Sequence, residues 1–335
     1  MYRIAKLPVE ERQILFQNTS AKKGLNAAVV EKDFWVCLVL DYLFRSSKWK
    51  NEIAFKGGTS LSKSYKAIER FSEDIDLILD WRTLGYEKEE PWEERSNTKQ
   101  QAFIADSRER LFSFLRNDFV PEFSESMSDV LQNETNISID ENDEGIVNFE
   151  YPNLFSEPSI LQAIRLEIGA LAAWTPTQIT EITPYAAEEY PDIFEMKSTE
   201  VLTTTAERSF WEKATILHQE AFRPETSIIP ARYSRHYYDL YCMSKTDIKQ
   251  RAIEQPELLE EVARFKDKFY PRKWARYDLA RIGTLKLMPA SHSESRLRND
   301  YASMREMIFG DYPSYDELME GINILEAEVN NPVCK

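Results

Sequence analysis

Two aspartates stand one residue apart in the segment Asp74-Ile75-Asp76-Leu77-Ile78-Leu79. Its alternation of polar and apolar residues predicts a β-strand, in which successive side chains point to opposite faces of a sheet. Asp74 and Asp76 therefore project from one face, where two carboxylates repel each other unless a cation lies between them. Mg²⁺ or Mn²⁺ suits such oxygen ligands, and Mg²⁺ commonly combines one or two carboxylates with substrate phosphates and water. The alternative is a solvated strand face without a ligand.

A pair of glycines precedes these aspartates by one short predicted helix. Gly57 and Gly58 allow a tight turn and a close approach of the main chain to a ligand. Thr59 and Ser60 add hydroxyl groups, and a helix that begins here directs backbone N–H groups toward an anion. The four residues predict a phosphate-binding turn, and a turn without a ligand is the alternative.

A third acidic residue comes from the alternating segment 164–170, which we expect to form another strand. Arg165 and Glu167 share one face of that strand, so Glu167 would lie beside Asp76 if the two strands are neighbours. We predict Asp74, Asp76 and Glu167 as metal ligands. The alternative for Glu167 is an ion pair with Arg165 or another surface cation.

The elements around these residues predict an α+β domain over residues 1–203. Strands are expected at 53–56, 75–79, 164–170 and 179–183 and in a hairpin at 137–151, and helices at 8–18, 28–45, 60–68 and 102–122.

From residue 204 onward the pattern becomes helical, which predicts a second domain over 204–335. Thr204 and Glu207 resemble a capping box at the start of a helix over 206–222. Further helices are expected at 232–243, 256–269, 272–287 and 294–308.

The charge of the chain is unevenly distributed. The net charge is −15, from 42 Lys and Arg against 57 Asp and Glu. Between Arg208 and Arg305, however, 19 Lys and Arg stand against 13 Asp and Glu. The basic back half could hold a phosphate backbone while the acidic front half holds a metal ion. Two solvated surfaces with a chance imbalance are the alternative.

The remaining composition favours a cytoplasmic protein. The sequence contains no apolar run of about 18 residues that would span a membrane, and its start lacks the apolar core of a secretory signal. Cys37, Cys242 and Cys334 lie far apart and suggest no disulfide framework.

The motifs resemble those of the AbiEii/AbiGii toxin family, a branch of the DNA polymerase β-like nucleotidyltransferases. Gly57-Gly58-Thr59-Ser60-Leu61 matches the family's GGT[SA]L turn, and Arg70-Phe71-Ser72-Glu73-Asp74-Ile75-Asp76 matches its RxSxDxD motif. A later EK-led helix followed by a [KR]DxxD helix matches Glu212-Lys213-Ala214 and Arg235-His236-Tyr237-Tyr238-Asp239-Leu240. His236 replaces the usual first Asp of that last piece, while Asp239 is retained.

The resemblance implies a polymerase β-like fold, with a mixed central sheet flanked by helices and followed by a mainly helical domain. It also implies a Mg²⁺-dependent enzyme that uses an NTP and acts as the toxin of a toxin–antitoxin or phage-defence system. The expected partner is a winged-helix antitoxin of the AbiEi type. Some relatives, the MenT-type toxins, add nucleotides to the 3′ end of tRNA, so an RNA acceptor is expected here.

Roles for the remaining motif residues follow from the same resemblance. Lys213 would neutralise charge on the triphosphate, and Asp239 would orient Lys213 or Arg235 through a salt bridge. The alternatives are a solvated helix lysine beside Glu212 and an ion pair on a helix surface. Lys56 and Arg70 are lesser candidates for phosphate contact.

Ser72 has three open roles: a hydrogen bond to phosphate, a phosphorylation site that would block the metal site by its charge, or a serine that satisfies a backbone group at the start of a strand.

Two other functions stay open at this stage. The chain could transfer a phosphoryl or nucleotidyl group to a protein or small-molecule hydroxyl. It could also be a nucleotide-binding module without catalysis.

Overall fold

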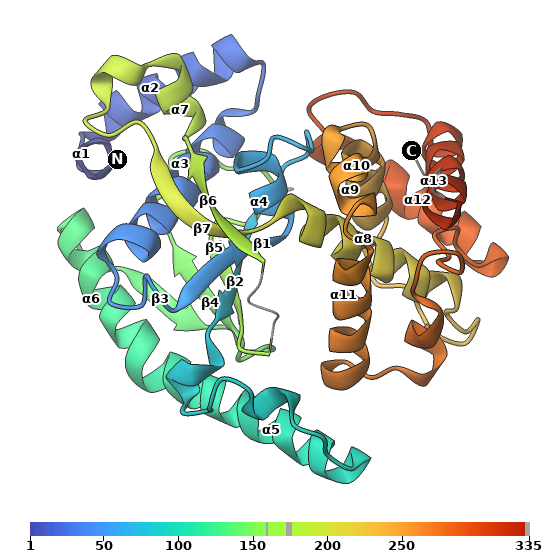
Figure 1. Cartoon of the computed structure of the whole chain (residues 1–335). Helices are drawn as coiled ribbons and strands as arrows, with labels where there is room; N and C mark the ends of the chain where they lie inside the picture. Colours follow the sequence, from blue (N-terminus) through green and yellow to red (C-terminus); the bar gives the residue numbers. More distant parts are fainter. Residues whose placement is uncertain (159, 172–175, 332–335) are drawn as a thin grey trace. The chain divides into compact units, whose positions relative to one another are not determined.

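The computed structural model describes residues 1–158, 160–171 and 176–331 (Figure 1). Cys334 lies outside the described residues. The chain folds into two compact units. The first comprises Met1–Ser64 and Ser72–Thr203, and the second comprises Tyr65–Phe71 and Thr204–Lys335. A short segment between two elements of the first unit, Tyr65–Phe71, thus folds with the second.

The first unit is α+β, as the sequence predicts, and is built on a mixed sheet of seven strands in the order β3-β4-β5-β2-β1-β7-β6. The strands are β1 (Ile53–Lys56), β2 (Asp74–Leu79), β3 (Asn136–Ile139), β4 (Ile146–Glu150), β5 (Ile164–Gly169), β6 (Thr177–Ile182) and β7 (Thr199–Thr204). The strand β2 runs antiparallel to β1 and parallel to β5, and β1 runs parallel to β7. The strand β7 was not predicted.

The predicted helices of the first unit are present with other bounds, whereas the helices at Tyr2–Ala5 and Tyr185–Glu189 and most of the one at Val120–Leu131 were not predicted. The helices of this unit are α1 (Tyr2–Ala5), α2 (Val9–Lys23), α3 (Ala27–Asp41), α4 (Gly57–Lys63), α5 (Asn97–Phe114), α6 (Val120–Leu131) and α7 (Tyr185–Glu189). A π-helical turn, Leu115–Phe119, joins α5 to α6. The diglycine is part of α4 rather than a turn before it, since the helix begins at Gly57.

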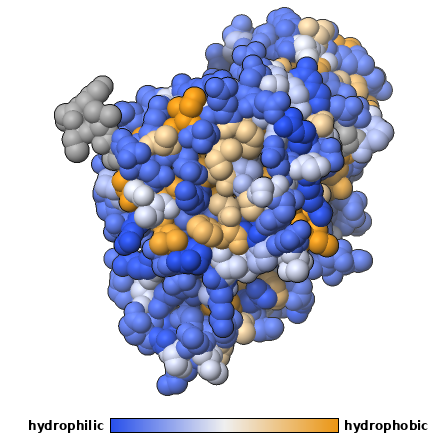
Figure 2. Space-filling model, turned by 90° about the vertical axis from the view of Figure 1, so that its right-hand side faces the viewer, coloured by the Kyte–Doolittle hydropathy of each residue, from blue (hydrophilic) through white to orange (hydrophobic). Residues whose placement is uncertain are grey.

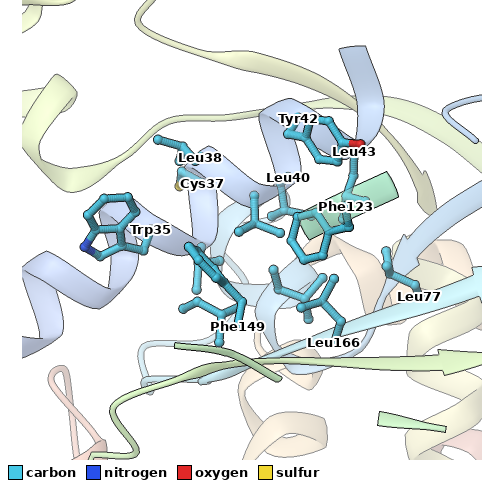
Figure 3. Close-up of a cluster of buried hydrophobic side chains, with 14 of the residues drawn as sticks. Trp35, Cys37, Leu38, Leu40, Tyr42, Leu43, Leu77, Phe123, Phe149 and Leu166 are labelled. Atoms are coloured by element: carbon cyan, nitrogen blue, oxygen red, sulfur yellow. The ribbon is translucent and has the colours of Figure 1, made fainter. Parts of the chain in front are cut away.

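The core of this unit lies between α3, α6 and one face of the sheet (Figure 3). Every residue of α3 from Ala28 to Asp41 is buried, as expected for a helix whose apolar residues cover most of its surface. Leu77 of β2 and Leu166 of β5 project into this core, where Figure 3 shows them near Phe123 and Phe149. Because side chains alternate along a strand, Asp74, Asp76 and Glu167 point to the opposite face.

Charged residues near the start of α3 fix the elements that carry the predicted site. Lys32 Nζ lies 2.9 Å from Glu73 Oε2, next to the first residue of β2. Asp33 Oδ1 lies 2.6 Å from Nζ of Lys63, the last residue of α4. All four are buried, so each pair keeps its charges compensated away from water.

The second unit is mainly helical. Its helices are α8 (Ala206–Ala221), α9 (Arg235–Ser244), α10 (Asp247–Ile253), α11 (Pro256–Phe269), α12 (Glu294–Ser303) and α13 (Tyr315–Asn330). The bounds of α11 match the prediction, whereas α10 and α13 were not predicted.

Two local predictions in this unit are wrong. The helix expected over 272–287 is absent, and the segment contains two single 3₁₀ turns, Lys273–Ala275 and Tyr277–Leu279. Left-handed backbone at Arg276 and Gly283 interrupts any continuous helix there. The cap of α8 is Thr205, whose side chain accepts from Arg208 N, because Thr204 still belongs to β7.

One face of the molecule is shown in Figure 2, where hydrophilic side chains dominate and apolar ones form separate patches. Of the helices in the described ranges, none combines the length and the apolarity that a membrane span needs.

Candidate functional site

The predicted acidic residues meet on neighbouring strands of the first unit. The register between β2 and β5 pairs Asp76 with Glu167 and Asp74 with Arg165. The three acids therefore lie on one face of two adjacent parallel strands, which is the neighbourhood that the sequence required of Glu167. Their side chains are accessible: Asp74 is 25% exposed and Glu167 is 42% exposed.

Gly57 lies directly against the Asp76 carboxylate. It has a φ of +80°, and a Cβ built at this position would lie 1.8 Å from Asp76 Oδ2. Only glycine fits here without displacing the carboxylate, since any side chain would occupy its place. The antiparallel register supports the same neighbourhood, because Lys56, directly before Gly57, pairs with Asp76. The diglycine and the second aspartate thus form one local site.

The hydroxyl groups after the diglycine are directed to the main chain. Thr59 Oγ1 donates to Asp74 O at 2.5 Å, and Ser60 Oγ donates to Gly57 O at 2.9 Å. Both residues are buried. The expected contact of these two hydroxyl groups with a phosphate stays a prediction. The backbone N–H groups at the start of α4 are further candidate phosphate donors.

Ser72 stands just before β2, half-buried. Its carbonyl oxygen lies 3.4 Å from Thr59 Oγ1. Its place near the start of the strand is compatible with all three roles weighed for it.

A guanidinium group lies between two of the acids. Arg165 Nε is 3.9 Å from Asp74 Oδ1, and Arg165 Nη2 is 3.9 Å from Glu167 Oε1. Sequence reasoning named Arg165 only as the alternative partner of Glu167, and this alternative is present in the structure.

Within the described residues, no three acidic, histidine or cysteine side chains converge as a ready-made metal site. The donor set nevertheless fits Mg²⁺, because that ion takes hard oxygen ligands and usually binds through one or two carboxylates together with substrate phosphates. The contact of Gly57 with Asp76 brings the start of α4 beside this carboxylate, because no side chain separates the two residues.

The later motif residues form a buried charge cluster within the second unit. Arg70 donates two hydrogen bonds to the Asp239 carboxylate, from Nε to Oδ1 at 2.6 Å and from Nη2 to Oδ2 at 2.9 Å. Lys213 Nζ lies 2.8 Å from Asp239 Oδ2 and 3.3 Å from His236 Nδ1. The expected salt bridge between Asp239 and Lys213 is present. Neither residue lies on a solvated helix surface, so the two solvent-exposed alternatives are wrong.

Burial and neighbouring charges set the protonation of this cluster. Burial opposes ionisation of Asp239, but the charges of Arg70 and Lys213 outweigh it and hold the pKa of that carboxyl below its usual range. Burial, together with the charge of Lys213, holds the pKa of His236 well below its usual value, so its ring is neutral. A neutral Nδ1 accepts from the Lys213 ammonium.

Two buried ion pairs, one in each unit, were not predicted from the sequence. The Lys32–Glu73 pair braces the residue directly before Asp74. The ion pair between Arg70 and Asp239 joins residues 169 positions apart, so no local sequence pattern could reveal it. A signal did exist for the first, because charged residues within an otherwise apolar helix indicate buried partners.

The family follows from a sequence comparison. A family model described as the nucleotidyl transferase AbiEii toxin of a type IV toxin–antitoxin system matches residues 40–321. The chain belongs to the AbiEii family. This membership makes the protein a nucleotidyltransferase and a toxin of the type IV class, with an NTP substrate and an antitoxin partner. No curated protein sequence matched.

Solved structures give weaker similarities. MenT4, a nucleotidyltransferase toxin from Mycobacterium tuberculosis, is 15% identical with a TM-score of 0.45, over 93% of this chain and 98% of that chain. JHP933 from Helicobacter pylori is 12% identical with a TM-score of 0.42, over 90% of this chain and 91% of that chain.

Proposed function

We propose that this AbiEii-family protein transfers a nucleoside monophosphate from an NTP to the hydroxyl group at the 3′ end of tRNA and releases pyrophosphate, in a Mg²⁺-dependent reaction. The observation that supports the proposal is the close contact of Gly57 with Asp76, which is paired with Glu167 in the register of β2 and β5. It brings backbone donors for phosphate and oxygen ligands for a cation to the same place.

The residues of the first unit have separate tasks in this proposal. Asp74 and Asp76 hold the metal ion, with Glu167 as a further ligand that also accepts the proton of the attacking hydroxyl. The N–H groups of Gly57 and Gly58 donate to the phosphates of the NTP. When bound, Mg²⁺ would offset the charge of the phosphoryl group and promote ionisation of the hydroxyl.

The second unit contributes charge in this proposal. Lys213 neutralises part of the triphosphate, and Asp239 holds it in position. An ammonium group has several donor hydrogens, and the contacts to Asp239 and His236 leave one for a phosphate oxygen. The two hydrogen bonds from Arg70 hold Asp239 in place, so Arg70 positions this carboxylate and does not contact the phosphate.

Transfer of radioactive label tests the reaction. The purified protein is incubated with Mg²⁺, total tRNA and each NTP in turn, labelled either on the α or on the γ phosphate. The proposal expects the α label on tRNA and no γ label. Label on a protein or small molecule, or γ label on any acceptor, would favour the phosphotransferase alternative.

Removal of one carboxylate is the matched test of the site. Asp74→Asn and Asp76→Asn should each abolish transfer while the thermal unfolding midpoint stays near that of the wild type, because both side chains are partly exposed. Transfer at the wild-type rate in either variant would instead favour a protein whose chemistry lies elsewhere, or a module that only binds nucleotide.

Two further expectations stay proposals. We propose that the antitoxin is a winged-helix protein of the AbiEi type and that the toxin acts in the cytoplasm. Co-purification of the toxin with the product of a neighbouring gene that encodes such a protein would test the first.

A further inference from the structure

A second candidate site lies within the second unit, away from the acidic strands in sequence. A pocket of about 560 Å³ lies between α11 and the segment that follows it. Five cationic residues line it: Arg264, Arg272, Lys273, Arg276 and Arg281. We refer to it as the arginine-lined pocket. Its wall also contains the acidic residues Glu260, Asp267 and Asp278.

The positive charge of the second unit is concentrated in the segment that contains most of this wall. From Arg264 to Lys286 the chain has eight Lys and Arg against two Asp and Glu. That surplus of six equals the whole surplus between Arg208 and Arg305, where 19 stand against 13. The surplus of positive charge in the back half therefore lies in one short segment of the sequence.

Three of these cations are available for an external anion. Arg276 pairs with Asp278 at 2.9 Å, which uses one acid of the wall. In the described parts of the chain, no carboxylate forms an ion pair with Arg272, Lys273 or Arg281. All three are exposed. Like charges around one hollow repel each other, and an anion bound between them would remove that repulsion.

The segment that presents these cations is fixed to α8. Lys286 N donates to His218 Nδ1 at 3.0 Å, so Nε2 carries the ring hydrogen and donates to Arg276 O at 2.9 Å. Tyr277 Oη donates to Gln219 Oε1 at 2.7 Å. The irregular main chain is thus held at successive positions by one helix, and the pocket is preorganised for binding.

The wall suits a phosphate backbone better than a nucleotide. Tyr277 is its aromatic residue, but this ring is buried and its hydroxyl is engaged. The described wall therefore presents no exposed ring on which a base could stack. What it offers is exposed Arg and Lys, which neutralise phosphodiesters without reading sequence.

We propose that the arginine-lined pocket binds the phosphodiester backbone of the RNA acceptor through Arg272, Lys273 and Arg281. This inference rests on the proposed function, in which RNA is the acceptor. It assigns acceptor binding to a place in the second unit that takes no part in binding the NTP.

Binding of fluorescein-labelled tRNA, measured by anisotropy without NTP over a range of salt concentrations, tests the proposal. The variant combines Arg272→Gln, Lys273→Gln and Arg281→Gln. The matched control combines Lys88→Gln, Lys99→Gln and Lys197→Gln, which removes the same charge from exposed positions of the first unit. Both variants should keep the wild-type unfolding midpoint.

We expect the pocket variant to bind tRNA roughly tenfold more weakly or worse, and its salt slope to fall by about 2 to 3, as expected for three lost phosphate contacts. The control should bind within about twofold of the wild type. Equal weakening in both variants, an unchanged salt slope, or a wild-type protein that does not bind tRNA would overturn the proposal.

Two additional arms separate the possible failures. If the pocket variant keeps tRNA binding but loses the binding of inorganic phosphate, the pocket serves a small anion and the proposal is overturned. If the variant loses tRNA binding while the wild type transfers no nucleotide, the proposed function fails and the pocket stands. If the wild type transfers nucleotide and the variant binds tRNA normally, the proposed function stands and the pocket fails.

Discussion

At the residue scale, the candidate site depends on how little space separates Gly57 from the Asp76 carboxylate. A side chain at this position would meet Oδ2 at 1.8 Å. The residue also needs left-handed backbone, with a φ of +80°. Two separate demands therefore favour glycine here, and they can be told apart by comparison with another glycine.

Gly57→Ala should abolish nucleotide transfer and destabilise the fold, because the methyl group must displace Asp76. Gly24→Ala is the control, since Gly24 has a φ of +66° but a Cβ there would meet nothing within 4 Å. The strained backbone alone costs about 1–2 kcal/mol of unfolding free energy, which urea denaturation measures in both variants. A Gly57→Ala protein that is as active as Gly24→Ala would contradict the close contact.

Asp239 gives a pH-dependent prediction. Its pKa is lowered in the folded protein, whereas an aspartate in the unfolded chain titrates near pH 4. A lowered folded pKa contributes stability above the unfolded pKa, and that contribution is lost as the pH falls through the folded pKa.

Asp239→Asn should therefore cost about 3–5 kcal/mol of unfolding free energy at neutral pH, because it leaves Arg70 and Lys213 buried without their counter-charge. The difference from the wild type should stay constant between about pH 8 and 5 and shrink below about pH 4. Urea denaturation across this range tests it. A difference that is as large at pH 3 as at pH 7 would show that the Asp239 charge is not the cause.

At the element scale, α3 holds the site together through charge. Asp33 of α3 binds Lys63 of α4 and also accepts from Tyr185 N at 2.7 Å. The helix that begins with the diglycine is thus tied at its far end to the core helix. Its position beside β2 depends on this buried pair.

Lys63→Met should destabilise the first unit by about 3–5 kcal/mol, because the Asp33 carboxylate loses its counter-charge in the core. The double variant Asp33→Asn/Lys63→Met should be more stable than the sum of the two single changes predicts. Urea denaturation of all four proteins gives the coupling. Simple additivity would mean that the pair does not hold α4.

Some helices and strands could be predicted from the sequence, and others could not. The strands β2 and β5 were predicted because one face of each is apolar and the other polar, a pattern with a period that no helix shares. The helix over 272–287 was a wrong prediction, since composition does not show that Arg276 adopts left-handed backbone. The strand β7 (Thr199–Thr204) was missed because its threonines do not mark a buried face.

At the scale of the whole molecule, the α+β class and the proximity of Asp74, Asp76 and Glu167 could be predicted from the sequence. The assignment of Tyr65–Phe71 to the second unit was not, because it depends on contacts with residues much later in the chain. Phe71 N, for example, donates to Met307 O at 2.7 Å. Local patterns predict elements, whereas such long-range pairing is decided by tertiary packing.

The proposed function of the whole molecule requires that Asp74 and Asp76 bind a metal ion together with the triphosphate that Gly57 and Gly58 contact. Calorimetric titration of a non-hydrolysable NTP analogue, with and without Mg²⁺, tests it most directly in the wild type and in Asp76→Asn. We expect Mg²⁺ to strengthen binding to the wild type by roughly tenfold or more, since a divalent ion offsets the repulsion between carboxylates and phosphates. In Asp76→Asn we expect little gain. Equal affinity of the wild type with and without Mg²⁺ would show that these aspartates do not bind a metal ion with the triphosphate.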